Sequence, residues 1–105
     1  MHRLCDLEAL APGQALAVEV SGLGVLLVGT VDGPRAFHNV CPHQGRSLDF
    51  APGEFLFTRD GRLVCPHHGA AFELPSGTCV QGPCEGDGLR EIALIEQAGG
   101  LWMAG

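Results

Sequence analysis

The chain has 105 residues, a length that suits one compact domain, and we expect residues 1–105 to form a single domain. Its formal net charge is −6 with only 6 Lys and Arg, a balance that argues against nucleic acid as a partner. The longest apolar run, Gly22 to Val31, is too short to span a bilayer, and the first residues lack the apolar stretch of a signal peptide. We therefore expect a cytoplasmic protein with no membrane partner.

The first part of the chain reads as strands joined by glycine turns. With 16 Gly and 7 Pro, the composition favours a turn-rich β protein over a helical bundle. We expect a short helical turn and then three strands, in the order 7–10, 16–20, 25–28 and 35–40. His2, ahead of them, is expected to belong to a mobile terminus. The third strand ends where the chain reaches Cys41.

Two further strand pairs are expected in the second part of the chain. Asp60-Gly61 between the apolar runs 55–58 and 62–65 is a strong hairpin signal. Residues 89–96 and 101–103 form a last pair across Gly99-Gly100. Because no stretch keeps a helical period for long, the predicted fold class is all-β with antiparallel sheets.

Two short segments carry the chemistry: Cys41-Pro42-His43-Gln44-Gly45 and Cys65-Pro66-His67-His68-Gly69. Each follows a predicted strand and places a thiol and an imidazole within one tight turn. Two thiolates with two neutral imidazoles suit either Zn²⁺ or an iron–sulfur cluster. Structural zinc sites usually pair Cys with Cys and His with His, whereas each segment here mixes the two. The chain has five cysteines, an odd number, so we expect cysteines that bind metal in a reducing compartment and not a secreted disulfide framework.

The pattern Cys-Pro-His-x-Gly followed by Cys-Pro-x-His-Gly-x-x-Phe resembles the Rieske iron–sulfur family, and the likeness continues through Phe72, Gly77 and Gly82-Pro83. The resemblance implies a small domain of antiparallel sheets with two cluster-binding loops and one [2Fe–2S] cluster per chain. Cys41 and Cys65 would bind the inner iron, and His43 and His68 the outer iron near the surface. Pro83 would lie in a loop that covers the cluster. No residue is expected to be catalytic.

Departures from the family pattern predict a low reduction potential. High-potential members join an extra cysteine in each loop, and the matching positions are Arg46 and His67. Those members also donate hydroxyl hydrogen bonds to the cluster from a Ser and a Tyr, where this chain has Ala70 and Phe72. Donors aimed at cluster sulfurs stabilise the added electron, so their absence lowers the potential toward the lower end of a range of roughly −150 to +300 mV.

No metal-binding role is expected for the remaining cysteines, for Trp102 or for the other polar residues of the ligand loops. Cys79 and Cys84 are expected to be two free thiols in a loop, although a local disulfide is the alternative. Cys5 and Trp102 are expected to be core residues. Gln44 and His67 lie inside the ligand loops and are candidates for a docking surface.

The resemblance implies a soluble one-electron carrier, similar to the ferredoxins of ring-hydroxylating dioxygenases. Its expected partners are a flavin-dependent reductase and a terminal oxygenase, which it would meet through transient docking. The protein alone would not be an enzyme. Two alternatives remain open at this point. The chain could be a small Rieske-type subunit of a larger oxidoreductase such as nitrite reductase, or a structural zinc-binding interaction module.

Overall fold

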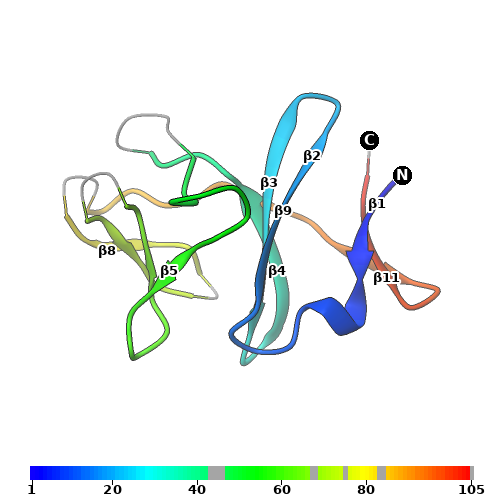
Figure 1. Cartoon of the computed structure of the whole chain (residues 1–105), viewed down its shortest axis with the longest axis horizontal. Helices are drawn as coiled ribbons and strands as arrows, with labels where there is room; N and C mark the ends of the chain where they lie inside the picture. Colours follow the sequence, from blue (N-terminus) through cyan, green and yellow to red (C-terminus); the bar gives the residue numbers. More distant parts are fainter. Residues whose placement is uncertain (43–46, 67–68, 75, 83–84, 105) are drawn as a thin grey trace.

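Three antiparallel β-sheets form the fold in the computed structural model, which describes residues 1–42, 47–66, 69–74, 76–82 and 85–104. They follow one another along the long axis of the molecule, with both chain termini at one end (Figure 1). The described residues include no α-helix, and none of their helical segments is long and apolar enough to cross a membrane. The all-β prediction is confirmed.

The central sheet has the strand order β2-β3-β4-β9 and contains the longest strands. Its members are β2 (Ala15–Val20), β3 (Leu23–Thr30), β4 (Gly33–His38) and β9 (Glu91–Ile92). The hairpin between β2 and β3 turns at Ser21 and Gly22, whose φ angles of 50° and 85° are both positive. Two such residues make the tight turn whose twist matches that of the flanking strands. The three strands predicted in this part of the chain are all present.

Strand β3 is covered on both faces, and its alternating side chains separate two hydrophobic cores. Val25 and Leu27 face a core shared with the terminal sheet, whereas Leu26 and Val28 face the core that contains Cys41 and Cys65. Successive side chains of a strand point to opposite faces, so an uninterrupted apolar run is what a strand buried on both sides requires. The central sheet is thus the layer between a terminal sheet and a third, loop-rich sheet.

The terminal sheet joins the two ends of the chain. It consists of β1 (His2–Asp6), β11 (Gly100–Met103) and β10 (Ile95–Gln97), and the single-turn 3-10 helix η1 (Leu7–Ala9) follows β1. His2 pairs with Met103, so the predicted mobile terminus is wrong: backbone pairing with β11 fixes the first residues. The expected strand over 89–96 is in fact two strands, because β9 pairs with β4 and β10 pairs with β11.

The third sheet has the order β5-β6-β7-β8 and is built from very short strands. These are β5 (Leu56–Phe57), β6 (Leu63–Val64), β7 (Ala71–Phe72) and β8 (Cys79–Gln81). Pairing of Leu56 with Val64 confirms the hairpin predicted around Asp60-Gly61. Strands β7 and β8 were not predicted, because two or three residues are too few to display a period. This sheet carries the second cysteine–histidine segment between β6 and β7.

Candidate metal centre

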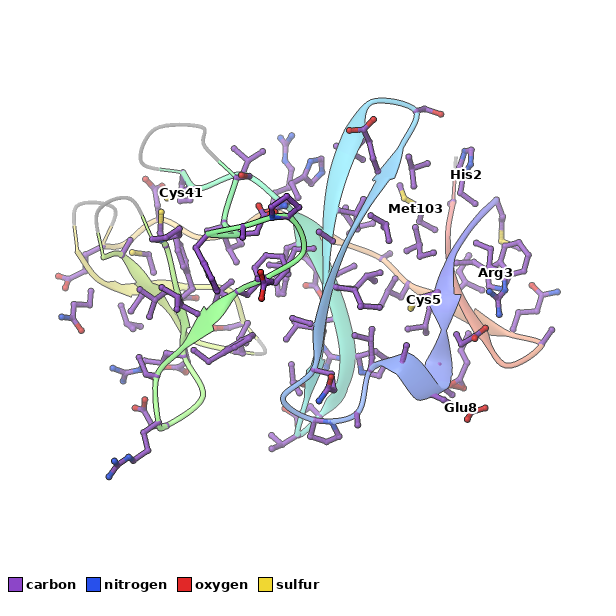
Figure 2. The ribbon with its side chains drawn as sticks, viewed as in Figure 1. His2, Arg3, Cys5, Glu8, Cys41 and Met103 are labelled. Atoms are coloured by element: carbon purple, nitrogen blue, oxygen red, sulfur yellow. The ribbon has the colours of Figure 1, made fainter. Side chains whose placement is uncertain are left out.

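Cys41 and Cys65 both lie where a strand has just ended. Cys41 follows β4 of the central sheet, and Cys65 follows β6 of the third sheet. Each is only 1% exposed, and both belong to the same buried core. Figure 2 shows Cys41 at the end of the molecule opposite to His2 and Met103. The two strands therefore deliver two buried sulfur atoms to one end of the fold.

The predicted imidazole ligands His43 and His68 lie outside the described residues, as do Gln44, Arg46, His67, Pro83 and Cys84. Within the described ranges, no group of three or more His, Cys, Asp or Glu is close enough to hold a metal ion. The full set Cys41, His43, Cys65 and His68 therefore stays a prediction.

Backbone hydrogen bonds close the second ligand loop at its base. The Cys65 N–H donates to the Ala70 carbonyl at 2.7 Å, and the Gly69 N–H donates to the Cys65 carbonyl at 3.0 Å. One step further out, Val64 pairs with Ala71 in the β6–β7 ladder. Gly69 has a φ of 72°, a left-handed conformation that glycine adopts without steric cost. The second loop is thus an extension of a β-hairpin that fixes where Cys65 begins it.

A side-chain bridge closes the first ligand loop. The Asn39 Oδ1 accepts from the Leu48 N–H at 2.8 Å, and the Asn39 Nδ2 donates to the Asp49 Oδ1 at 3.4 Å. The other carboxylate oxygen of Asp49 accepts from the Gly53 N–H at 3.1 Å. Asn39 itself is held by its N–H, which donates to the Gly24 carbonyl at 3.0 Å. This bridge was not predicted from the sequence, where its signal was a pair of short polar residues flanking the cysteine–histidine segment.

The bridge also affects the ionisation of Asp49. Partial burial acts to raise the pKa of this carboxyl, but hydrogen bonds outweigh that effect and hold the pKa below its ordinary value. The donors are the Gly53 N–H, the Ser47 hydroxyl, the Asp49 backbone and the Asn39 side chain. The bridge therefore contains a carboxylate that is charged at neutral pH.

A third segment packs directly against the second ligand loop. Gly82 has a φ of 99°, and a Cβ added there would lie 2.8 Å from the Ala70 Cα. Only glycine permits both this conformation and this approach. Behind it, the Cys79 N–H donates to the Asp87 carbonyl at 2.8 Å, and the Cys79 Sγ lies 3.4 Å from the Gln81 carbonyl. Gly82 therefore brings the end of the segment that contains β8 against the loop that begins at Cys65.

The described part of the site fits an iron–sulfur group. Two thiols lie in a water-excluding core, and soft sulfur ligands in such surroundings suit iron–sulfur chemistry. Ala70 and Phe72, the positions where high-potential relatives carry hydroxyl donors, are both fully buried in that core. Neither side chain can donate a hydrogen bond.

Fold and site together define a small β domain with paired cysteine–histidine loops, and comparison with known proteins identifies its class. The model of the Rieske [2Fe-2S] domain matches residues 1–96. The chain belongs to the Rieske [2Fe–2S] domain family, whose members bind a [2Fe–2S] cluster. This family is the one that the cysteine–histidine pattern resembled.

Among solved structures, the chain is similar to the ferredoxin of carbazole 1,9a-dioxygenase from Nocardioides aromaticivorans IC177. Their sequences are 26% identical, the TM-score is 0.77, and the match covers 97% of this chain and 94% of that one. The terminal oxygenase of the same system matches at 25% identity and a TM-score of 0.80, over 97% of this chain and 29% of that one.

A curated relative, the glycine betaine monooxygenase oxygenase subunit of Chromohalobacter salexigens, is 30% identical over 92% of this chain. The chain spans only 23% of that relative's length. The same domain therefore occurs both in a ferredoxin and as a part of oxygenase subunits.

Proposed function

We propose that residues 1–105 form one Rieske domain that acts as a one-electron carrier. In this proposal Cys41, His43, Cys65 and His68 hold the cluster, and the partners are a flavin-dependent reductase and a terminal oxygenase. The observation that carries it is the burial of Cys41 and Cys65 in one core, each at the start of a loop with a histidine in its sequence. When bound, the cluster supplies a one-electron redox couple.

The residues around the two cysteines favour a low potential. Ala70 and Phe72 offer no hydroxyl to a sulfur, so the reduced form gains no hydrogen bond from either. Burial of Cys41 and Cys65 keeps water from the sulfurs on the side of the core. Weak stabilisation of the added electron suits a carrier that must pass it on.

An exposed apolar pair beside the first ligand loop supports transient docking. Val40 is 44% exposed and Phe50 is 51% exposed, and they adjoin Asn39 and Asp49 of the side-chain bridge. Large exposed apolar side chains next to a functional loop are typical of contact surfaces. A small interface of this kind suits a carrier that must leave its partner after each transfer.

A second candidate is that the chain serves as the Rieske domain of an oxygenase. The 30% identity to an oxygenase subunit favours it. The size of the native protein in its source separates the two candidates. A persistent large partner or a longer polypeptide would favour the oxygenase domain over the free carrier.

The first experiment is anaerobic purification followed by iron and acid-labile sulfide assays and an EPR spectrum after dithionite reduction. A rhombic signal with the low average g value of mixed His/Cys ligation, with two irons per chain, is expected. A colourless protein with one zinc would instead support a structural zinc module. Reduction by a flavin-dependent reductase and reoxidation by an oxygenase then test the partners, with Phe50→Ser expected to slow transfer without moving the potential.

A further inference from the structure

The two ligand loops are closed at their bases by different means. The second loop is closed by backbone pairing on both sides, from the β6–β7 ladder to the bond between the Cys65 N–H and the Ala70 carbonyl. At the base of the first loop, Asn39 meets Leu48 and Asp49 of the segment that leaves the loop. There the connection is made by the side chains of Asn39 and Asp49.

We infer that Asn39 and Asp49 are positioning residues that set the span of the first ligand loop and thereby retain the cluster. This inference rests on the proposed ligand set, because it assigns Cys41 and His43 to that loop. The bridge ties the segment leaving the loop, through the Leu48 N–H, to the end of β4, where Cys41 begins it. The hydrogen bond from the Asn39 N–H to the Gly24 carbonyl holds Asn39 against the central sheet. Through Asn39, the bridge therefore also holds Leu48, on the other side of the loop, in a fixed position.

The bridge requires one amide and one carboxylate at positions 39 and 49. The Asn39 side chain presents an acceptor oxygen, used by the Leu48 N–H, and a donor NH2 group, used by Asp49. Asp49 in turn receives the Asn39 amide on one oxygen and the Gly53 N–H on the other. Each oxygen of the Asp49 carboxylate thus accepts a hydrogen bond from one donor. Two carboxylates at positions 39 and 49 would place two acceptors opposite each other, and two amides would place a donor opposite a donor in one of these contacts.

That matching makes a reciprocal exchange possible. Asn39→Asp alone keeps the acceptor for the Leu48 N–H but sets one carboxylate against another. Asp49→Asn alone directs an amide N–H toward a donor. The double variant Asn39→Asp/Asp49→Asn restores the pattern, because an acceptor again faces Leu48, a donor joins the two side chains and an acceptor faces Gly53. A control variant is Thr30→Val, which removes the hydroxyl that donates to the Gly33 carbonyl at 2.7 Å at the β3–β4 turn of the central sheet.

The experiment measures the rate of iron release from the purified, cluster-loaded protein to a chelator at neutral pH, well below the unfolding temperature. Thermal unfolding midpoints and EPR spectra are recorded for the same samples. We expect Asn39→Asp to release iron about tenfold faster and Asp49→Asn a few-fold faster, which corresponds to the loss of about one hydrogen bond. The double variant should return to about the wild-type rate. Thr30→Val should lower the unfolding midpoint without changing iron release.

Each alternative result has a separate meaning. Asn39→Asp protein that is fully loaded and releases iron at the wild-type rate would overturn the positioning role and leave the proposed electron carrier intact. Equal acceleration in Thr30→Val, or no recovery in the double variant, would also overturn it, because release would then follow general stability. Wild-type protein that contains no iron or sulfide would overturn the ligand assignment together with this inference.

Discussion

The central sheet and the third sheet differ in how they are held together. Strands β2 and β3 pair over six residues and β3 and β4 over another six, with side chains buried on both faces of β3. Strands β5, β6 and β7 have two residues each, so each of them pairs with the next over only two residues. Long strand ladders around a hydrophobic core are stable by themselves. A region of short strands depends for its stability on whatever crosslinks its loops.

This contrast suits a metal-binding domain. The rigid half supplies a fixed end of β4, from which Cys41 begins, while the loop-rich half supplies Cys65 and the segment that packs on Ala70. Binding of a metal group to residues from both halves contributes free energy to the folded state alone. Stability in the third sheet is therefore expected to depend on the cluster, and stability in the central sheet is not.

The largest expected effect comes from Cys65→Ser. We expect loss of the bound iron, because a buried thiolate ligand is removed. Hydrogen exchange should then quicken at third-sheet amides such as Leu63 and Phe72, while amides of β3 stay protected. Cys5→Ser is the matched control, since Cys5 is half-buried in the terminal sheet and should leave iron content unchanged. If Cys65→Ser lowered hydrogen-exchange protection equally in the central and third sheets, the expected difference in how the two sheets depend on the cluster would be contradicted.

Leu27→Ala is expected to lower the stability of the protein and, unlike Cys65→Ser, to leave the cluster in place. This fully buried side chain lies in the core between the central and terminal sheets. Its truncation should lower the free energy of unfolding by about 2–5 kcal/mol, with the EPR signal of the loaded protein unchanged. Leu56→Ala, at a position 42% exposed in β5, should cost less than about 1 kcal/mol. An altered EPR signal in Leu27→Ala would show that the two halves are coupled more tightly than their packing indicates.

The two halves also differ in how much of their structure could be predicted from the sequence. The strands of the central sheet were predicted because their apolar runs are long and bounded by glycine turns such as Ser21-Gly22. Strand β1 was missed because its pairing partner, β11, lies at the far end of the chain. The cysteine–histidine pattern predicted the correct family because the spacing of these residues in the sequence is enough to recognise it. The bridge between Asn39 and Asp49 was not, because it depends on two segments meeting in space.

A smaller effect is expected from Phe72→Tyr, which adds a hydroxyl in the core of the cysteines while keeping the ring. If the hydroxyl donates to a sulfur, it stabilises the reduced form. The potential should rise by about 20–60 mV, the equivalent of one hydrogen bond for a one-electron couple. Protein-film voltammetry measures it, with Phe57→Tyr, in β5, as the control. An unchanged potential in Phe72→Tyr would remove the hydroxyl argument for a low value.

The smallest effect is expected in the stability contributed by Asp49 when the pH is lowered. Hydrogen bonds hold the pKa of Asp49 below its ordinary value of 3.8 in the folded protein, so its ionised form contributes stability that is fully present at neutral pH. That contribution should fade as the pH drops below about 5 and through the lowered pKa. At neutral pH, Asp49→Asn should therefore unfold about 4 °C below the wild type, a difference of roughly 1 kcal/mol or less for a partly exposed group.

The measurement is the difference in unfolding midpoint between the two proteins from pH 7 to pH 3. Glu19 lines the same surface hollow as Asp49, and it is present in both proteins. The gap should shrink toward zero at the acid end, because protonated Asp49 and asparagine then resemble each other. A gap that stays constant with pH would mean that shape and not charge at position 49 stabilises the bridge. The first ligand loop would then depend on packing, as the central sheet does, and the contrast between the two halves would weaken.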